Sequence, residues 1–250
     1  MESNYDKQVF IARELFLKYD QEAIIRKFQL KADEEWIYLP MLDRMYRVSR
    51  SSGVIEYRSV DSEKKMSSEN MSVDSEKQIC DVDMTADSEK QVCDADLIAN
   101  LEKQTCGEYA ECLDYQVVMT IYDVLCCSKD MPVLAHEWCP VYSLQITMSS
   151  PNADTFTGRY ARLFSGNTDR LLTACKKLGG EQPVMRAGAD VCWQFAVFPF
   201  FPVQMRFWDG DEEFAPKIQL LWDKKALDFM HFETIYYVQG HLMERLAELF

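Results

Sequence analysis

The acidic segment at residues 209–213 is the stretch of this 250-residue chain whose residue types most directly suggest chemistry. Asp209, Asp211, Glu212 and Glu213 surround Gly210, and carboxylate oxygens are the ligands that Ca²⁺ and Mg²⁺ prefer. The segment lacks the full spacing of a known calcium loop. A hairpin tip that stays in water, and whose charges keep the strand edges from pairing with other chains, explains the same residues. We therefore predict a hairpin tip and assign no metal ligand.

The chain has three histidines: His136, His231 and His241. Imidazole and carboxylate groups together form the sites that divalent metals and general acid–base pairs use. His136 with Glu137, and His231 with Glu233, could converge on Asp211 in such a site, but nothing in their spacing shows that they meet. The third histidine falls within an expected helix and is predicted to lie at the surface or to pack.

Aromatic residues are concentrated around the acidic segment. Nine of them lie between Val191 and Asp223: Trp193, Phe195, Phe198, Phe200, Phe201, Phe207, Trp208, Phe214 and Trp222. They make up more than a quarter of that segment, against 12% aromatic residues in the whole chain. Each aromatic side chain buries a large area, so we expect the densest part of the core here. Trp208 and Phe214, at the two ends of the acidic turn, are expected to give it a packing role.

Alternation of apolar and polar residues predicts three strands in the same segment. Apolar residues occupy every second position in 191–197, 203–207 and 218–222. Two prolines separate the first two strands, and the acidic turn separates the last two. These short connections predict an antiparallel meander, with Trp193 and Phe207 on its core face.

The rest of the ordered chain is predicted to be mostly helical. Apolar residues spaced three and four apart predict helices within 5–30 and at 115–126, 157–164, 169–178 and 233–250. Within residues 5–30, Asp20 is predicted to cap a second helix. Gly179-Gly180 is predicted to end the helix at 169–178. A hairpin at 36–48 and a strand at 141–148 are also expected. The predicted fold class is α+β, with N-terminal and central helices packed on a small, mostly antiparallel sheet.

A 13-residue repeat interrupts this pattern. Asp-Ser-Glu-Lys begins at Asp61, Asp74 and Asp87, a decayed copy begins at Asn100, and cysteines recur at Cys80, Cys93 and Cys106. The repeat has too few apolar residues to offset the chain entropy lost on folding, so we predict a disordered tandem-repeat insertion in a surface loop. Cysteines thirteen residues apart provide none of the close pairs typical of zinc sites. The predicted organisation is an N-terminal part at 1–56, the insertion at 57–111 and a main part at 112–250 that forms one domain with the first.

Charge and cysteine usage narrow the function classes. The formal net charge of −14 argues against nucleic-acid binding, which normally needs a basic surface. Residues 61–111 hold fourteen acidic residues and five lysines, so most of the acidity belongs to the repeat. There is no run of about eighteen apolar residues that predicts a membrane span. Nine cysteines behind an N-terminus without a secretory pattern predict reduced thiols in a soluble, cytoplasmic protein.

The chain carries a family resemblance over most of residues 5–55 and 113–240, and the resemblance skips the repeat. Residues 200–214 (FFPVQMRFWDGDEEF), followed by Leu220–Asp223 and His231–Glu233, resemble the C-terminal pattern of the bacterial family called domain of unknown function 3786. Residues 132–138 are similar to that family's Pro-Leu-x-x-Glu-Trp loop, and residues 171–180 to its Leu-Gly-Gly helix end. The chain departs from the pattern at Ala215, where the family usually has proline, and at residues 232–234, where it tends to have Thr-Glu-Asp.

The resemblance implies a compact α+β domain without an established activity, and some relatives are joined to iron–sulfur segments. A cluster needs cysteines two or three residues apart. In this chain only Cys126 and Cys127 are close, and they lie on an expected helix, so we predict no iron–sulfur cluster.

Two functions from different classes remain open. The first is a non-catalytic binding or accessory module for an unidentified protein or small molecule, without cofactor, nucleic acid or membrane. The second is a metal-assisted hydrolase built on residues 209–213 with His136 or His231. No complete catalytic motif is present, and Cys139 is predicted to be a core residue rather than a nucleophile, so the first is preferred. The candidate binding residues are Glu137, Trp138, Trp208, Asp209, Asp211, Glu213, Asp223, His231 and Glu233.

Overall fold

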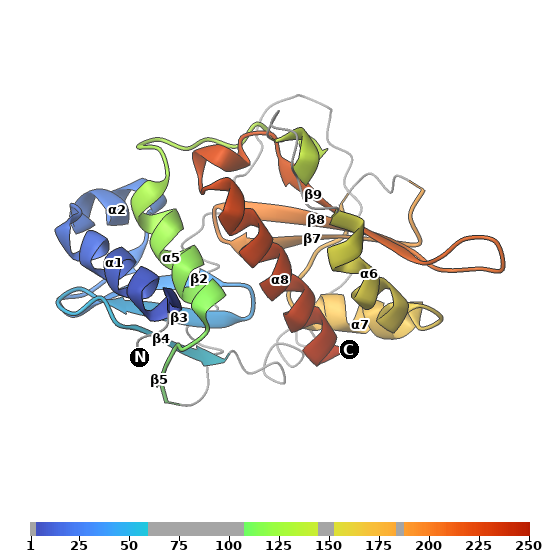
Figure 1. The fold of residues 1–250 in the computed structure, drawn as a ribbon, viewed down its shortest axis with the longest axis horizontal. Coiled ribbons are helices and arrows are strands. Elements are labelled where there is room, and N and C mark those ends of the chain that lie inside the picture. The colour runs from blue at the N-terminus through green and yellow to red at the C-terminus, as the bar shows by residue number, and fades with distance from the viewer. Residues whose placement is uncertain (1–3, 60–107, 145–152, 184–187) are drawn as a thin grey trace, which may run out of the picture.

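The computed structural model describes residues 4–59, 108–144, 153–183 and 188–250, which form helices and two antiparallel sheets (Figure 1). The predicted α+β class is confirmed. Most of the predicted repeat insertion, residues 60–107, lies outside the described residues. Among the described residues, no helix combines the length and the apolar character needed to cross a membrane.

The first sheet contains five strands in sequence order: β1 (Lys31–Ala32), β2 (Trp36–Met41), β3 (Arg44–Ser49), β4 (Ile55–Ser59) and β5 (Ala110–Glu111). The predicted hairpin is the β2–β3 pair, and Leu42 at its turn has a φ of 54°. Tyr57 pairs with Ala110, so the chain on the two sides of the repeat lies side by side. The residues at both ends of the predicted insertion, 57–59 and 110–111, are therefore strand residues of this sheet.

The second sheet has the order β6-β9-β8-β7, with β6 at Trp138–Pro140, β7 at Val191–Phe198, β8 at Phe201–Trp208 and β9 at Lys217–Asp223. Strands β7, β8 and β9 form the predicted antiparallel meander. Trp193 and Phe207 are buried, as expected for its core face. The strand predicted from Val141 is wrong for the part that is described. The chain forms a short 3-10 helix at Val141–Ser143 instead, because the Leu144 N–H bonds back to the Val141 carbonyl at 3.1 Å rather than to a neighbouring strand.

Six α-helices are described: α1 (Asn4–Lys18), α2 (Gln21–Phe28), α5 (Tyr115–Cys127), α6 (Ala153–Phe164), α7 (Thr168–Lys177) and α8 (Phe232–Leu249). They agree with the predicted helical ranges to within a few residues. Asp20 caps α2 as predicted, since its carboxylate accepts a 3.0 Å hydrogen bond from the Ala23 N–H. Gly179, just beyond α7, has a φ of 80°, a conformation that favours glycine and ends a helix.

The helix α8 connects the two halves of the molecule. It packs against α5 on one side and against α6 and α7 on the other (Figure 1). Arg245 of α8 forms a two-point ion pair with Asp43 in the β2–β3 turn, with nitrogen–oxygen distances of 2.6 and 3.1 Å. The neighbouring Leu42 N–H donates a 2.9 Å hydrogen bond to the Val197 carbonyl of β7. These contacts hold the first sheet, the second sheet and α8 together around one core, in which His241 is also buried.

Candidate functional site

The carboxylate of Asp209 is part of the scaffold. It accepts hydrogen bonds from the Ser165 hydroxyl at 2.7 Å and from the backbone N–H groups of Gly166 and Gly210 at 3.0 and 2.8 Å. The Ser165 bond is the main reason that the pKa of Asp209 lies below its ordinary value. The Asp209 N–H donates in turn to Asp190 at 2.7 Å. Asp209 thus fastens the end of β8 to the turn between α6 and α7.

Asp211 closes the hairpin tip itself. Its carboxylate accepts hydrogen bonds from the backbone N–H groups of Glu213 and Phe214 at 2.8 and 2.7 Å. Glu212 and Glu213 are exposed, and the tip extends beyond the second sheet (Figure 1). Phe214 is 69% exposed, so the packing role expected for it is wrong: at the projecting tip no element of the described chain covers its ring.

Asp223 is a buried carboxylate at the end of β9, only 1% exposed. It accepts three backbone hydrogen bonds, from Ala135 at 2.9 Å, His136 at 2.7 Å and Lys225 at 2.8 Å. Three donors balance the cost of burying its charge. Asp223 therefore holds the loop that precedes β6, and its oxygens are already used by the backbone.

Three other candidate residues lie in the second sheet or directly beside it. Glu137 forms an ion pair with Lys224, and both side chains are largely exposed. Trp138 is the first residue of β6, where it pairs in register with Asp223. Trp208, at the end of β8, donates a 3.1 Å hydrogen bond from its indole nitrogen to the Gly188 carbonyl. These contacts support the scaffold and do not bring the side chains into a common site.

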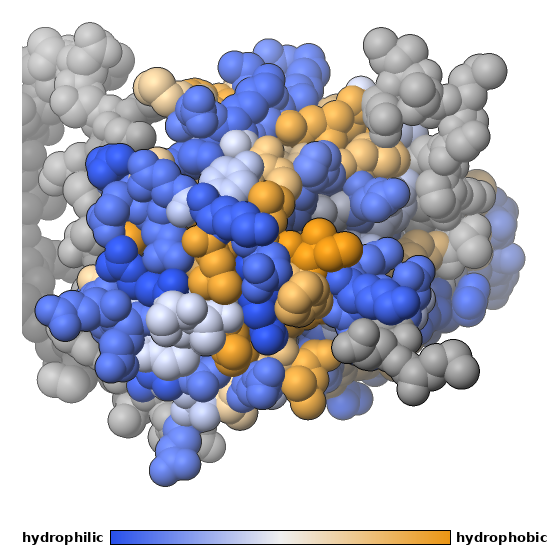
Figure 2. Space-filling model, turned by 60° about the vertical axis from the view of Figure 1, so that its left-hand side comes forward, coloured by the Kyte–Doolittle hydropathy of each residue, from blue (hydrophilic) through white to orange (hydrophobic). Residues whose placement is uncertain are grey.

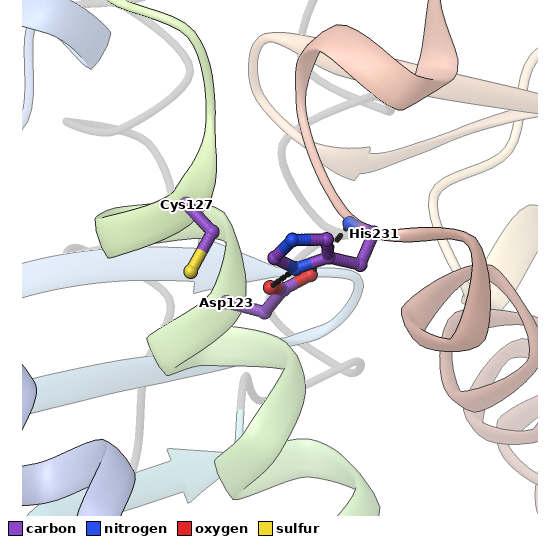
Figure 3. A group of neighbouring side chains, drawn as sticks. All are labelled: Asp123, Cys127 and His231. Atoms are coloured by element: carbon purple, nitrogen blue, oxygen red, sulfur yellow. Dashed lines mark hydrogen bonds and ion pairs between the residues drawn. The ribbon is translucent and has the colours of Figure 1, made fainter.

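His231 has a partner that the sequence did not indicate. Its Nδ1 atom contacts the Asp123 carboxylate of α5, and its backbone N–H donates to the same carboxylate at 2.8 Å (Figure 3). The Thr234 hydroxyl donates to Asp123 as well, at 2.6 Å. Asp123 thereby ties the residue before α8 and a hydroxyl of its first turn to a neighbouring helix. Glu233 lies in the first turn of α8 and is exposed.

Cys127 stands one turn after Asp123 on α5 and completes a group of three potential metal ligands with it and His231 (Figure 3). Their ligand atoms all lie within 4.8 Å of one another. Partial burial and the adjacent Asp123 charge raise the pKa of the Cys127 thiol to about 11. The acidic turn does not take part, since its tip projects away from the rest of the molecule and from the start of α8 (Figure 1).

An open groove runs beside this group of three residues, between α1 and α5. Its volume is about 250 Å³, and its lining is almost entirely apolar, with Asp123 and Cys127 at one side. Ile11 and Leu15 of α1 line it and remain 65% and 43% exposed. Figure 2 shows this end of the molecule, where apolar residues reach the surface between hydrophilic ones.

Sequence reasoning missed both features, although each left a signal. Asp123 and Cys127 are four residues apart on a strongly predicted helix, which places them on one face. Ile11 and Leu15 show the same spacing on the first helix, beside the apolar stripe that packs on the core. His231 lies 108 positions from Asp123 in the sequence, so no local pattern reveals that the two residues meet.

Comparison with known proteins gives one match. The family model described as "Domain of unknown function (DUF3786)" matches residues 97–245. No curated protein and no solved structure matches the chain.

Proposed function

The chain belongs to the DUF3786 family of domains of unknown function, and we propose that it is a non-catalytic binding module. In this proposal, the groove between α1 and α5 holds an amphipathic helix of a partner protein. The observation that carries the proposal is the exposure of Ile11 and Leu15, four residues apart, along an open apolar groove. Apolar surface rimmed by polar residues marks interaction sites, and helix-in-groove recognition uses this arrangement.

A helix suits this groove better than a compact small molecule does. The groove is open along one side, and its two walls are helices that lie against each other. A third helix can place its ridge of side chains into the furrow between two packed helices. Tyr19, one turn beyond Leu15, is 40% exposed and extends the apolar edge of α1.

Charge indicates the kind of helix. Asp123 lines the groove, and the negative charge of Asp130 acts on Tyr19 at the same end. Complementary charges speed association and fix orientation, so the partner helix should carry lysine or arginine beside its apolar face.

The carboxylates that first suggested catalysis favour the binding function. Asp209 accepts hydrogen bonds from the Ser165 hydroxyl and from backbone N–H groups, and one oxygen of Asp211 accepts them from two backbone N–H groups. The alternative proposal, a metal-assisted hydrolase on residues 209–213 with His136 or His231, therefore has less support. We also propose a reducing, cytoplasmic setting in a bacterial cell, which the free cysteines of the described chain favour.

The test uses a fluorescent model peptide, an amphipathic leucine–lysine helix, and measures its binding by fluorescence anisotropy. The double variant Ile11→Ser with Leu15→Ser should weaken binding about tenfold or more, because two apolar contacts are lost. A matched control, Met131→Ser with Leu163→Ser, removes apolar side chains that are also exposed but lie outside the groove. The control should bind as the parent does.

A second peptide with the same composition but a scrambled apolar face separates groove binding from charge attraction. It should bind weakly to all three proteins. Equal affinity of parent and groove variant for the amphipathic peptide, with unchanged melting curves, would show that the groove is not the binding surface.

A further inference from the structure

We infer that Asp123, Cys127 and His231 form a binding site for a transition-metal ion of the zinc class. The site lies at the C-terminal end of α5 and the start of α8 (Figure 3). The site shares Asp123 and Cys127 with the lining of the groove, but the inference rests on the three polar ligands and its test measures metal binding rather than peptide binding.

The types of ligand select the metal. A thiolate, an imidazole and a carboxylate are the ligands that Zn²⁺ and Co²⁺ accept in a tetrahedral site, whereas Ca²⁺ and Mg²⁺ require oxygen ligands. Asp123 and Cys127 come from successive turns of one helix, and His231 comes from a second element. Two ligands on one helix face and one from elsewhere define three corners of a tetrahedron.

The distances require only a small adjustment. Ligand atoms at about 2.0–2.3 Å from zinc stand roughly 3–4 Å apart. The three ligand atoms of the structure already lie within 4.8 Å of one another. Rotation of the Cys127 and His231 side chains can make up the difference, because both are accessible to solvent and His231 is 69% exposed.

Asp123 is the anchor of the site. One of its oxygens, Oδ2, accepts hydrogen bonds from the His231 N–H and the Thr234 hydroxyl, which fix the carboxylate. The other oxygen, Oδ1, contacts the His231 Nδ1 atom directly, and a bound metal would replace this contact. Hydrogen bonds such as those to Oδ2 orient metal ligands and strengthen metal sites.

Three protein ligands leave a fourth position on the metal open to water or to a ligand from solution. This arrangement distinguishes reactive zinc sites from closed structural sites, which use four protein ligands. The metal would have to displace the proton of the Cys127 thiol, as metals do when they bind cysteine.

The experiment titrates the metal-free full-length protein with Co²⁺, and with Zn²⁺ by calorimetry. One Co²⁺ per chain should bind and produce the near-ultraviolet absorption of a cobalt–thiolate bond. Cys127→Ser should abolish that absorption, and His231→Gln should weaken Zn²⁺ binding by about 10-fold to 100-fold. Both positions are accessible, so these variants should fold; melting curves confirm it.

Two controls identify the ligands among nine cysteines and three histidines. A variant with Cys80, Cys93 and Cys106 changed to serine should bind Co²⁺ as the parent does. His136→Asn changes another exposed histidine, at a backbone φ of 55° that asparagine tolerates, and should also leave binding intact. Cobalt–thiolate absorption that persists in Cys127→Ser, or calorimetry without binding, would overturn the inference.

Discussion

The Asp123 carboxylate of α5 accepts a 2.8 Å hydrogen bond from the backbone N–H of His231, the residue just before α8. His231 makes no side-chain cap to its own helix. Asp123 also accepts a hydrogen bond from the Thr234 hydroxyl in the first turn of α8, at 2.6 Å. One side chain thus fixes the start of α8 to α5 and places the imidazole beside the groove between α1 and α5.

The first prediction concerns the contact between Asp123 and the start of α8. Replacing Asp123 with alanine should lower the free energy of unfolding by about 1–2 kcal/mol, because two donors at the start of α8 lose their acceptor. Urea denaturation measures the change. Asp20→Ala, which removes the exposed cap of α2, is the matched control and should cost about 1 kcal/mol or less. An Asp123→Ala variant as stable as the parent would mean that the contact contributes nothing to the docking of α8.

A second prediction concerns the core of the meander. Trp193 of β7 is 3% exposed and Phe207 of β8 is completely buried. Truncating either residue to alanine should cost on the order of 3–5 kcal/mol, from lost burial and from the cavity left behind. Ala196→Ser, at an exposed position of β7, should stay within about 0.5 kcal/mol of the parent. Midpoints in urea that do not separate the core variants from this control would contradict the assigned core face.

Much of this fold follows from local pattern. Burial on one face of a strand demands a period of two residues, and the alternation around Trp193 and Phe207 shows it. Helix caps are also local: Asp20 precedes its helix and bonds to a backbone group three residues later. The division into two separate sheets is not local, since it depends on which strands pair after the chain has folded.

The candidate site was much less predictable. The residue types of the acidic turn suggested a solvated tip, but the partner that holds Asp209, Ser165, is 44 residues away. Likewise, Asp223 bonds to Ala135 across 88 residues. Carboxylates can serve the scaffold or a ligand, and sequence alone does not distinguish the two, because the distinction depends on which backbone donors arrive from distant segments.

A third prediction contrasts two of these carboxylates. Asp223 is buried with three backbone donors, so Asp223→Ala should cost about 3 kcal/mol or more, since these N–H groups lose their acceptor. Asp211→Asn keeps a side-chain oxygen for its two backbone donors at the exposed tip and should change stability by less than about 0.5 kcal/mol. Denaturation in urea compares them. A large loss in Asp211→Asn would require a charge-dependent role for the tip.

The last prediction concerns His241, which is 4% exposed within α8. Burial, followed by the positive charge of Arg44, lowers its pKa from 6.5 to about 4. Arg245 acts in the same direction, and Asp114 and Asp43 oppose it. The folded protein therefore holds a neutral imidazole at a pH where the unfolded chain already binds a proton.

The sign of the pH dependence follows from that difference. Above about pH 6.5 the imidazole is neutral in both states and costs no stability through protonation. As the pH falls from about 6.5 toward 4, the unfolded state gains the proton first, so the folded state loses up to roughly 3 kcal/mol. Urea denaturation of the parent and of His241→Leu between about pH 7.5 and pH 4.5 measures this loss. The parent should lose about 2–3 kcal/mol more than the variant over that range. Parallel curves for the parent and His241→Leu would show that His241 is protonated in the folded protein as readily as in the unfolded chain.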